Sequence, residues 1–316
     1  MRKMIFILAS FALLASGCVR KELLEPGHKH GEEVYVSISI DAALDADVQT
    51  GDDPDMYRNI LQTARTVTIV AYPKDDRGHY GIHRVNGLEG TIWLMPGLYD
   101  LMIYTSDFFE LDGIYYRGIT SPSTAEAYTY QVRSSKTKTD VKNYDIDDPD
   151  PLFVHLYEDF EVKNGDNRLV SGLQPQSYKY WYEVDVDGLD YITTAYLEID
   201  GMYTSVYMAD GSHREDEFGT QRAESTIHKD ENKVKGEFFS FGPHQDSAVK
   251  NSIILTFVNG RTIRVKMDDI SPSIKKLRKG GEIIIEQKIV INVDDTGSGF
   301  VPEVKDWEEE EVEIPI

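Results

Sequence analysis

The stretch IILTFVNGRTIRVKM, residues 253–267, decides the fold class of this chain. Apolar and polar residues alternate on both sides of Asn259-Gly260, a dipeptide that tolerates positive φ at both positions of a tight turn. A two-residue turn pairs Val258 with Arg261, and the stretch predicts a hairpin whose second strand is buried on one face. On this register one face carries Ile254, Val258, Ile263, Val265 and Met267, and the other carries Thr262, Arg264 and Lys266.

The same period of two recurs along the chain. VYVSISI, residues 34–40, alternates strictly, and Asn86-Gly87 between His79–Val85 and Leu88–Leu94 predicts a second hairpin. Short helices are predicted over 56–64 and, after Ser271-Pro272, up to Gly280. Further strands are predicted over 66–72, 98–104, 152–160, 178–186, 193–199, 234–241 and 283–291.

Short strands at frequent turn signals favour an all-β fold of two tandem antiparallel β-sandwiches. The segment KNGDNRLVSGLQPQ, residues 163–176, is rich in Gly, Asn, Asp and Pro and is the expected boundary between them. The predicted domains are therefore an N-terminal sandwich, 34–165, and a C-terminal sandwich, 177–316.

The first residues have the layout of a signal peptide. Arg2 and Lys3 precede a run of about 13 apolar residues, too few for the roughly 20 that cross a bilayer. The run ends in LASGC, which resembles the bacterial lipobox, so cleavage is expected between Gly17 and Cys18 and lipidation, such as palmitate, at Cys18. Residues 1–17 are then the signal peptide, and 18–33 a lipidated tether.

Composition excludes several classes of function. The 316 residues have a net charge of −22 and one cysteine, so the chain is expected to repel nucleic acid and to have no intrachain disulfide and no cysteine-based zinc site. Past residue 17 no apolar run reaches transmembrane length, which makes the lipid the expected membrane anchor.

Candidate catalytic and metal-binding motifs are weak. DTGS, residues 295–298, is the active-site string of aspartic proteases but occurs once, where the mechanism needs two aspartates. DIDDPD, residues 145–150, lacks the glycine and the bidentate glutamate of a calcium loop and reads as an acidic turn. His79 and His83 have zinc-helix spacing in a segment that reads as a strand. No enzyme activity, metal or cofactor is predicted.

The aromatic residues allow a second hypothesis, that the chain binds sugars. Tyr178, Tyr180 and Tyr182 share one face of a predicted strand and Trp181 the other, which favours core packing over sugar stacking. If the chain binds glycans, Trp93, Trp181 and Trp307 are the residues of an exposed platform.

Several strings together resemble a family of lipoproteins from Bacteroides-type bacteria that is similar to the fimbrillin-like proteins, especially their anchor subunits. They are the lipobox at Cys18, MPGLYDLMIY (95–104), PLFVHLYEDFEV (151–162), IDGMYTSVYMADG (199–211), KGEFFSFG (235–242) and GFVPEVKDWEEEEVEI (299–314). The resemblance implies transthyretin-like β-sandwiches hung from the outer membrane at the cell surface, with Cys18 as the carried-over functional residue.

The same resemblance implies assembly with fimbrial subunits through strand pairing. Val312, Ile314 and Ile316 alternate at the C-terminus as such a strand would, although an ordinary last strand of the C-terminal sandwich has the same pattern. The expected function is adhesion or fimbrial anchoring without enzyme activity. The alternative is a glycan-binding surface lipoprotein associated with nutrient uptake.

Overall fold

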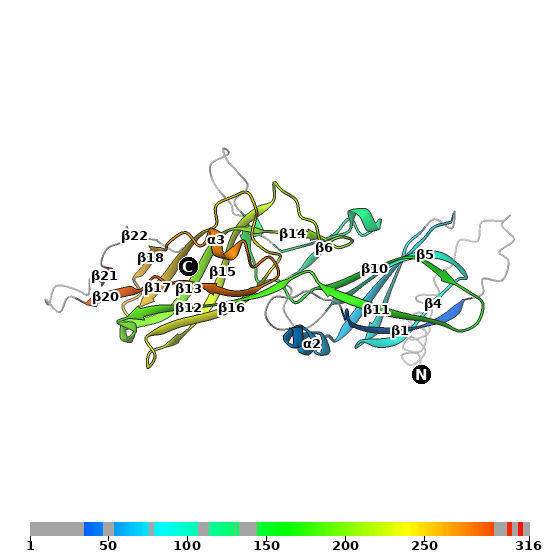
Figure 1. Ribbon diagram of the computed structural model, residues 1–316, viewed down its shortest axis with the longest axis horizontal. Coiled ribbons are helices and arrows are strands. Elements are labelled where there is room, and N and C mark those ends of the chain that lie inside the picture. The colour runs from blue at the N-terminus through cyan, green and yellow to red at the C-terminus, as the bar shows by residue number, and fades with distance from the viewer. Residues whose placement is uncertain are drawn as a thin grey trace, which may run out of the picture. The chain divides into compact units, whose positions relative to one another are not determined.

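The computed structural model describes residues 35–46, 54–75, 79–106, 114–129, 131–132, 144–293, 302–304 and 309–311. These residues belong to one compact unit, Tyr35–Ile316. Their strands form sheets of seven, twelve and three strands, with few helical turns (Figure 1). The predicted all-β class is confirmed, while the expected signal peptide and tether lie outside the described residues.

The seven-stranded sheet has the order β3-β2-β5-β10-β11-β1-β4. It contains the strands that the sequence predicts near 34–40, 66–72, 98–104 and 152–160. The bounds are β1 (Val36–Leu44), β2 (Thr66–Pro73), β3 (Gly81–Asn86), β4 (Glu89–Leu94), β5 (Gly97–Ser106), β10 (Phe153–Val162) and β11 (Asn167–Pro175).

The first core lies on one face of these strands and beneath one helix. Alternation puts Ile38 and Ile40 of β1 inside, with 0% and 1% exposure. Helix α2 (Pro54–Gln62) adds Tyr57 and Leu61, which lie four positions apart and so share one face. Burying a leucine of this kind stabilises the fold by about 2 kcal/mol.

The predicted hairpin at Asn86-Gly87 is wrong. Strand β3 pairs with β2 and β4 pairs with β1, and the described pairings include no ladder between β3 and β4. The turn therefore connects the two ends of the seven-strand order, with φ of 74° at Gly87. This arrangement buries Ile92 beside its partner Ile38 in the core.

The expected boundary at 163–176 is also wrong in part. The Gly and Asn residues form only a tight turn, in which Asn167 Nδ2 donates to the carbonyl oxygens of Lys163 and Gly165 at 2.9 Å each. From Asn167 onward the chain is β11, which pairs parallel with β1 and antiparallel with β10. Leu169 and Leu173 are buried, so the segment is a strand of the first core. The division into two domains stays a prediction.

The twelve-stranded sheet has the order β21-β20-β12-β16-β15-β13-β17-β18-β22, with β19 beside β12, β9 beside β15, and β8 beside β9. Its second core includes Tyr180, Leu197, Phe238 and Leu255. The short helix α3 (Ser271–Ile274) adds Ile274 and ends earlier than the sequence predicts. The bounds are β8 (Gln131–Val132), β9 (Tyr144–Ile146), β12 (Tyr178–Asp187), β13 (Ile192–Tyr203), β15 (Phe218–His228), β16 (Lys233–Ser240), β17 (Lys250–Phe257), β18 (Thr262–Lys266), β19 (Gly281–Ile284), β20 (Ile289–Val293), β21 (Pro302–Val304) and β22 (Glu309–Glu311).

The hairpin β17–β18 exists, but its register differs by one residue from the prediction. Phe257 N donates to Arg261 O at 2.8 Å, which leaves a three-residue turn with φ of 82° at Gly260. Ile253, Leu255 and Phe257 therefore share the buried face, and Val258 is 61% exposed. The one-sided burial of β18 is confirmed, with Ile263 and Val265 inside.

The third sheet has the order β14-β7-β6 and covers the outer face of β2, β5 and β10. Ala127 and Val206 pack there against Val70, Met102 and Val154, so both faces of these central strands are buried. Four pairings among the described strands are parallel, which the hairpin signals did not predict. The bounds are β6 (Tyr115–Arg117), β7 (Glu126–Tyr128) and β14 (Ser205–Tyr207), with a 3₁₀ turn, η1, at Pro122–Thr124.

Candidate functional site

The predicted functional residues lie at the two ends of the chain. Gly17 and Cys18, the expected cleavage and lipidation site, are outside the described residues, as are Val312, Ile314 and Ile316. Trp307 and the DTGS string at 295–298 are outside them too. Their assignments stay predictions.

The strand just before the predicted strand-exchange segment is described. β22 pairs antiparallel with β18, so that Glu311 lies opposite Ile263 and Glu309 opposite Val265. β22 stands at one end of the main strand order of the twelve-stranded sheet. Among the described strands β22 pairs with β18 alone, and a strand at the end of a sheet can pair with another chain along its second side.

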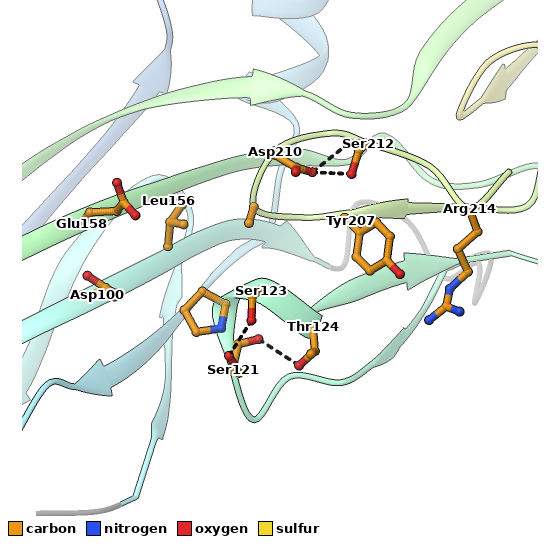
Figure 2. A pocket seen from close by; sticks show the side chains of 12 residues that line it. Asp100, Ser121, Ser123, Thr124, Leu156, Glu158, Tyr207, Asp210, Ser212 and Arg214 are labelled. Carbon is orange, nitrogen blue, oxygen red and sulfur yellow. Dashed lines mark hydrogen bonds between the residues drawn. The ribbon is translucent and has the colours of Figure 1, made fainter. Parts of the chain in front are cut away.

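A second candidate site is a pocket of about 680 Å³ beside the three-stranded sheet. Figure 2 shows Tyr207 between the hydroxyl groups near η1 and a loop that carries Asp210 and Ser212. Strands β5 and β10 form its far end, which Asp100, Leu156 and Glu158 line. The remaining lining residues are Ser121, Pro122, Ser123, Thr124, Ala209 and Arg214.

One wall is a tight turn around η1. Thr124 Oγ1 donates to Gly118 O at 2.7 Å, and the hydroxyl groups of Ser121 and Ser123 are 3.0 Å apart. Gly118 has φ of 65°, and a Cβ atom there would lie 2.0 Å from Thr124 O. The turn therefore requires glycine at this position, and the wall consists largely of hydroxyl groups.

The opposite wall is the loop after β14. Asp210 Oδ1 accepts hydrogen bonds from Ser212 N at 2.9 Å and from Ser212 Oγ at 2.7 Å, which fixes the loop. The guanidinium carbon of Arg214 lies 5.5 Å from the centre of the Tyr207 ring, a cation–π contact. Tyr207 and Arg214 are thus held against each other at the pocket wall.

A buried carboxylate holds Arg214 in place. Glu126 is 1% exposed and accepts from Arg214 Nε at 3.0 Å, from Arg117 Nε at 2.8 Å and from Arg117 Nη2 at 2.6 Å. Arg117 Nη2 also donates to Glu217 at 2.7 Å. Burial raises the pKa of Glu126, but the hydrogen bonds from Arg117 and its other donors outweigh burial and lower the pKa below its usual range. The hydrogen bond to Glu126 raises the pKa of Arg117.

A smaller pocket of about 210 Å³ adjoins the first. The two share Leu156, Ala209 and Asp210, and together they are called the polar groove below. His155 Nδ1 lies 2.7 Å from Gly172 O in the smaller pocket. Its other lining residues are Asp45, Val154, Gln174, Gln176 and Met208.

The aromatic residues of the sequence analysis separate into core and surface positions. Tyr180 and Tyr182 are buried, as expected, and the Tyr182 hydroxyl lies 2.6 Å from Ser225 Oγ. Trp181 is half-buried on β12, whereas Trp93 is 57% exposed on β4. These two tryptophans lie in different sheets, and the structure does not join them on one sheet face.

The remaining motifs do not form a metal centre among the residues that the structure describes, where no three His, Cys, Asp or Glu side chains are grouped to hold an ion. Burial lowers the pKa of His83. Asp145 lies in β9 rather than in a free acidic turn, and Asp148 Oδ1 accepts from Phe239 N at 2.6 Å.

Within the same described ranges, no helix is long and apolar enough to span a bilayer.

Sequence reasoning missed the polar groove. Its residues come from a turn, a loop and several strands that are far apart in the chain. Several of them lie in the strings that carry the family resemblance, but those strings assign them no ligand. The available signals were SPST at 121–124 and DGS at 210–212, which read only as turns.

Known proteins resemble this chain over most of its length. A protein of Bacteroides ovatus named "Putative fimbrium anchoring subunit Fim4B" is 24% identical over 349 residues, which cover 98% of this chain and 97% of that protein. A crystal structure of "a putative adhesin" from Bacteroides ovatus has 20% identity and a TM-score of 0.56, covering 82% of this chain and 93% of that one. The fimbrial anchor protein Mfa2 from Porphyromonas gingivalis has 14% identity and a TM-score of 0.45, covering 86% and 97%.

The match to the protein named as a fimbrium anchoring subunit confirms the resemblance that the quoted strings predict, and the adhesin structure confirms the fold. A family described as "Domain of unknown function (DUF5119)" matches residues 17–221, which is more than half of the chain. The chain therefore belongs to the DUF5119 family.

Proposed function

We propose that the protein is a lipid-anchored surface protein that acts in adhesion or as a fimbrial anchor or accessory subunit, without enzyme activity. The observation that carries the proposal is the end-to-end match to the relative named as a fimbrium anchoring subunit. A match over 97% of that protein leaves no large part of it without a counterpart in this chain.

Cys18 is the proposed point of attachment to the outer membrane. It stands at the end of an apolar run with small residues before it, and its acyl chains would hold the chain at a lipid surface. The strong negative charge of the rest of the chain gives no electrostatic attraction to anionic lipid, so the acyl groups must provide the binding energy.

Strand pairing is the proposed means of contact with a fimbrial subunit. β22 lies at an end of the main strand order, and residues 312–316 follow it directly with apolar residues at alternate positions. An extended segment of this kind binds through main-chain hydrogen bonds, while alternate side chains enter pockets. Pro315 lacks an N–H group, which restricts pairing at that position to one side.

Deletion of residues 312–316 tests the strand-pairing part. We expect the variant to lose the fimbrial subunit that co-purifies with the intact chain from native membranes, as identified by mass spectrometry. The control is Glu313→Ser, which changes the intervening side chain and keeps the three apolar ones. Equal recovery of the subunit by the deletion variant and the intact chain would rule out pairing through this segment.

The anchor is tested separately with Cys18→Ala. We expect the intact chain to incorporate a palmitate analogue and to sediment with outer membranes, and the variant to do neither. An intact mass that shows an unmodified N-terminus on native material would refute the lipid anchor.

A further inference from the structure

We propose that the polar groove binds a neutral oligosaccharide. This inference goes beyond fimbrial anchoring, since it uses neither Cys18 nor the C-terminal segment. The groove lies between η1, the middle of β10 at Leu156–Glu158, and the loop from Tyr207 to Arg214 (Figure 2).

The charges of the groove disfavour an anionic ligand. Lys74 Nζ lies 2.9 Å from Asp100 and 2.6 Å from Asp159, and Glu126 pairs with Arg214, so the two lining residues Asp100 and Arg214 are both ion-paired. The larger pocket also carries the carboxylates of Glu158 and Asp210, both exposed, and the smaller pocket adds that of Asp45. The groove is therefore negative, and a phosphate, sulfate or uronate group would be repelled.

The hydrogen-bonding groups suit a ligand that both donates and accepts. Carboxylates only accept, a guanidinium only donates, and hydroxyl groups do both. The hydrogen bonds that the structure gives Arg214 run from Nε to Glu126, which leaves its two amino groups to donate to a ligand. Glu158 supplies acceptors, Ser123 supplies a hydroxyl group, and the Ser212 oxygen, whose proton is donated to Asp210, can accept. Sugar hydroxyl groups match this mixture, whereas a basic side chain would use only the acceptors.

An aromatic ring lies among these polar groups. Tyr207 is half-buried, and the contact with Arg214 limits its movement. A rigid ring of this type provides apolar area for the C–H groups of a sugar, at a low cost in conformational entropy. The site thus combines stacking area with hydroxyl recognition.

The length of the groove favours a chain of sugars over a single one. The larger pocket falls in the range of roughly 300–1,000 Å³ that is usual for ligand sites. The adjoining pocket of about 210 Å³ continues past Asp210 to the amide side chains of Gln174 and Gln176, which donate and accept. A ligand that extends from Arg214 to Gln174 would contact polar groups along its whole length.

The test is calorimetric titration of the purified full chain with a panel of neutral oligosaccharides built from glucose, galactose, mannose and N-acetylglucosamine. Ser123→Trp fills the groove from an exposed position, and Glu158→Ala removes an acceptor without a partner recorded in the structure. We expect at least one oligosaccharide to bind and each variant to weaken it about tenfold or more, or about 1.4 kcal/mol.

The matched controls are Ser39→Trp on β1 and Glu161→Ala, which is exposed on the same strand as Glu158. We expect both to bind as tightly as the unchanged chain, and all four variants to keep its thermal midpoint. A lysine-rich peptide and a polyuronate are titrated alongside. If none of the neutral oligosaccharides binds, the proposal is overturned. Unchanged affinity in Ser123→Trp, or tight binding of the peptide alone, does so too, and none of these results bears on strand pairing or lipidation.

Discussion

The hydroxyl oxygen of Tyr57 accepts a hydrogen bond from the backbone amide of Lys179 at 2.9 Å, across 122 positions of the chain. Tyr57 belongs to α2 in the first core, and Lys179 belongs to β12 of the twelve-stranded sheet. The Tyr57 ring also packs edge-on against Phe153, with ring centres 6.3 Å apart. One helix side chain therefore connects the first core to the second sheet.

Tyr57→Phe should lower the free energy of unfolding by about 1 kcal/mol, because the amide of Lys179 loses its partner while the ring packing stays. Urea unfolding measures the change. Tyr80→Phe, at a residue with 40% exposure, is the control and should stay within about 0.5 kcal/mol of the unchanged chain. Equal effects of the two variants would show that the hydrogen bond contributes nothing.

Glu126→Gln should destabilise the fold by about 2–3 kcal/mol, since hydrogen bonds to a charged group are the strong ones and Arg117 and Arg214 both lose their acceptor charge. Denaturant titration at neutral pH checks this. The control, Glu161→Gln, changes an exposed carboxylate that pairs only with Lys163 among the contacts described, and it should cost less than about 0.5 kcal/mol. A loss for Glu126→Gln no larger than the control's contradicts the role assigned to the network.

Acidification should destabilise the loop that carries His213. Its ring stacks on Tyr203 with centres 4.2 Å apart, and burial lowers the pKa of His213 below its usual value near 6.5. Below that pH the His213 imidazole binds a proton in the unfolded chain more readily than in the folded chain, so stability falls as pH drops below about 6.5. A proton NMR titration of the imidazole measures the folded pKa. A value at or above that of a model peptide would contradict this assignment.

Gly118→Ala should destabilise more than Gly87→Ala. Both glycines have φ near 70°, at 65° and 74°, so both variants carry the cost of a left-handed alanine, about 1–2 kcal/mol. Only at Gly118 does the added Cβ approach another atom, 2.0 Å from Thr124 O, while the space around Gly87 is open. Thermal unfolding of the two variants separates the clash from the backbone strain. Equal midpoints would show that the turn at η1 adjusts freely.

The sequence predicts the strands well because alternation survives wherever one face of a strand is buried, as in β1 and β18. It fails where two alternative strand pairings would each bury apolar residues. Asn86-Gly87 fits a hairpin locally, yet β4 pairs with β1, where Ile92 lies opposite Ile38 and Leu94 opposite Val36. Likewise, the turn residues after Lys163 hide the short alternation of β11, whose parallel partner lies about 130 positions earlier in the chain.

The polar groove could not be predicted for a related reason. Arg117 lies opposite Glu126 in the β6–β7 pairing. Arg214 reaches them because β14 pairs with β7, and that pairing joins residues about 80 positions apart. Nothing in the local pattern of three-residue strands specifies such a partner, since short edge strands carry little alternation. The site depends on tertiary pairing rather than on a motif.

The register of the β17–β18 hairpin gives a sharp test of sequence against structure. A two-residue turn would place Val258 on the buried face, whereas the structure buries Phe257 at 1% exposure and leaves Val258 at 61%. Phe257→Ala should therefore cost about 3–5 kcal/mol through lost burial and the cavity left behind. Val258→Ser should stay within about 0.5 kcal/mol. Urea unfolding of both variants decides between the registers, since the shorter turn requires the larger loss at Val258.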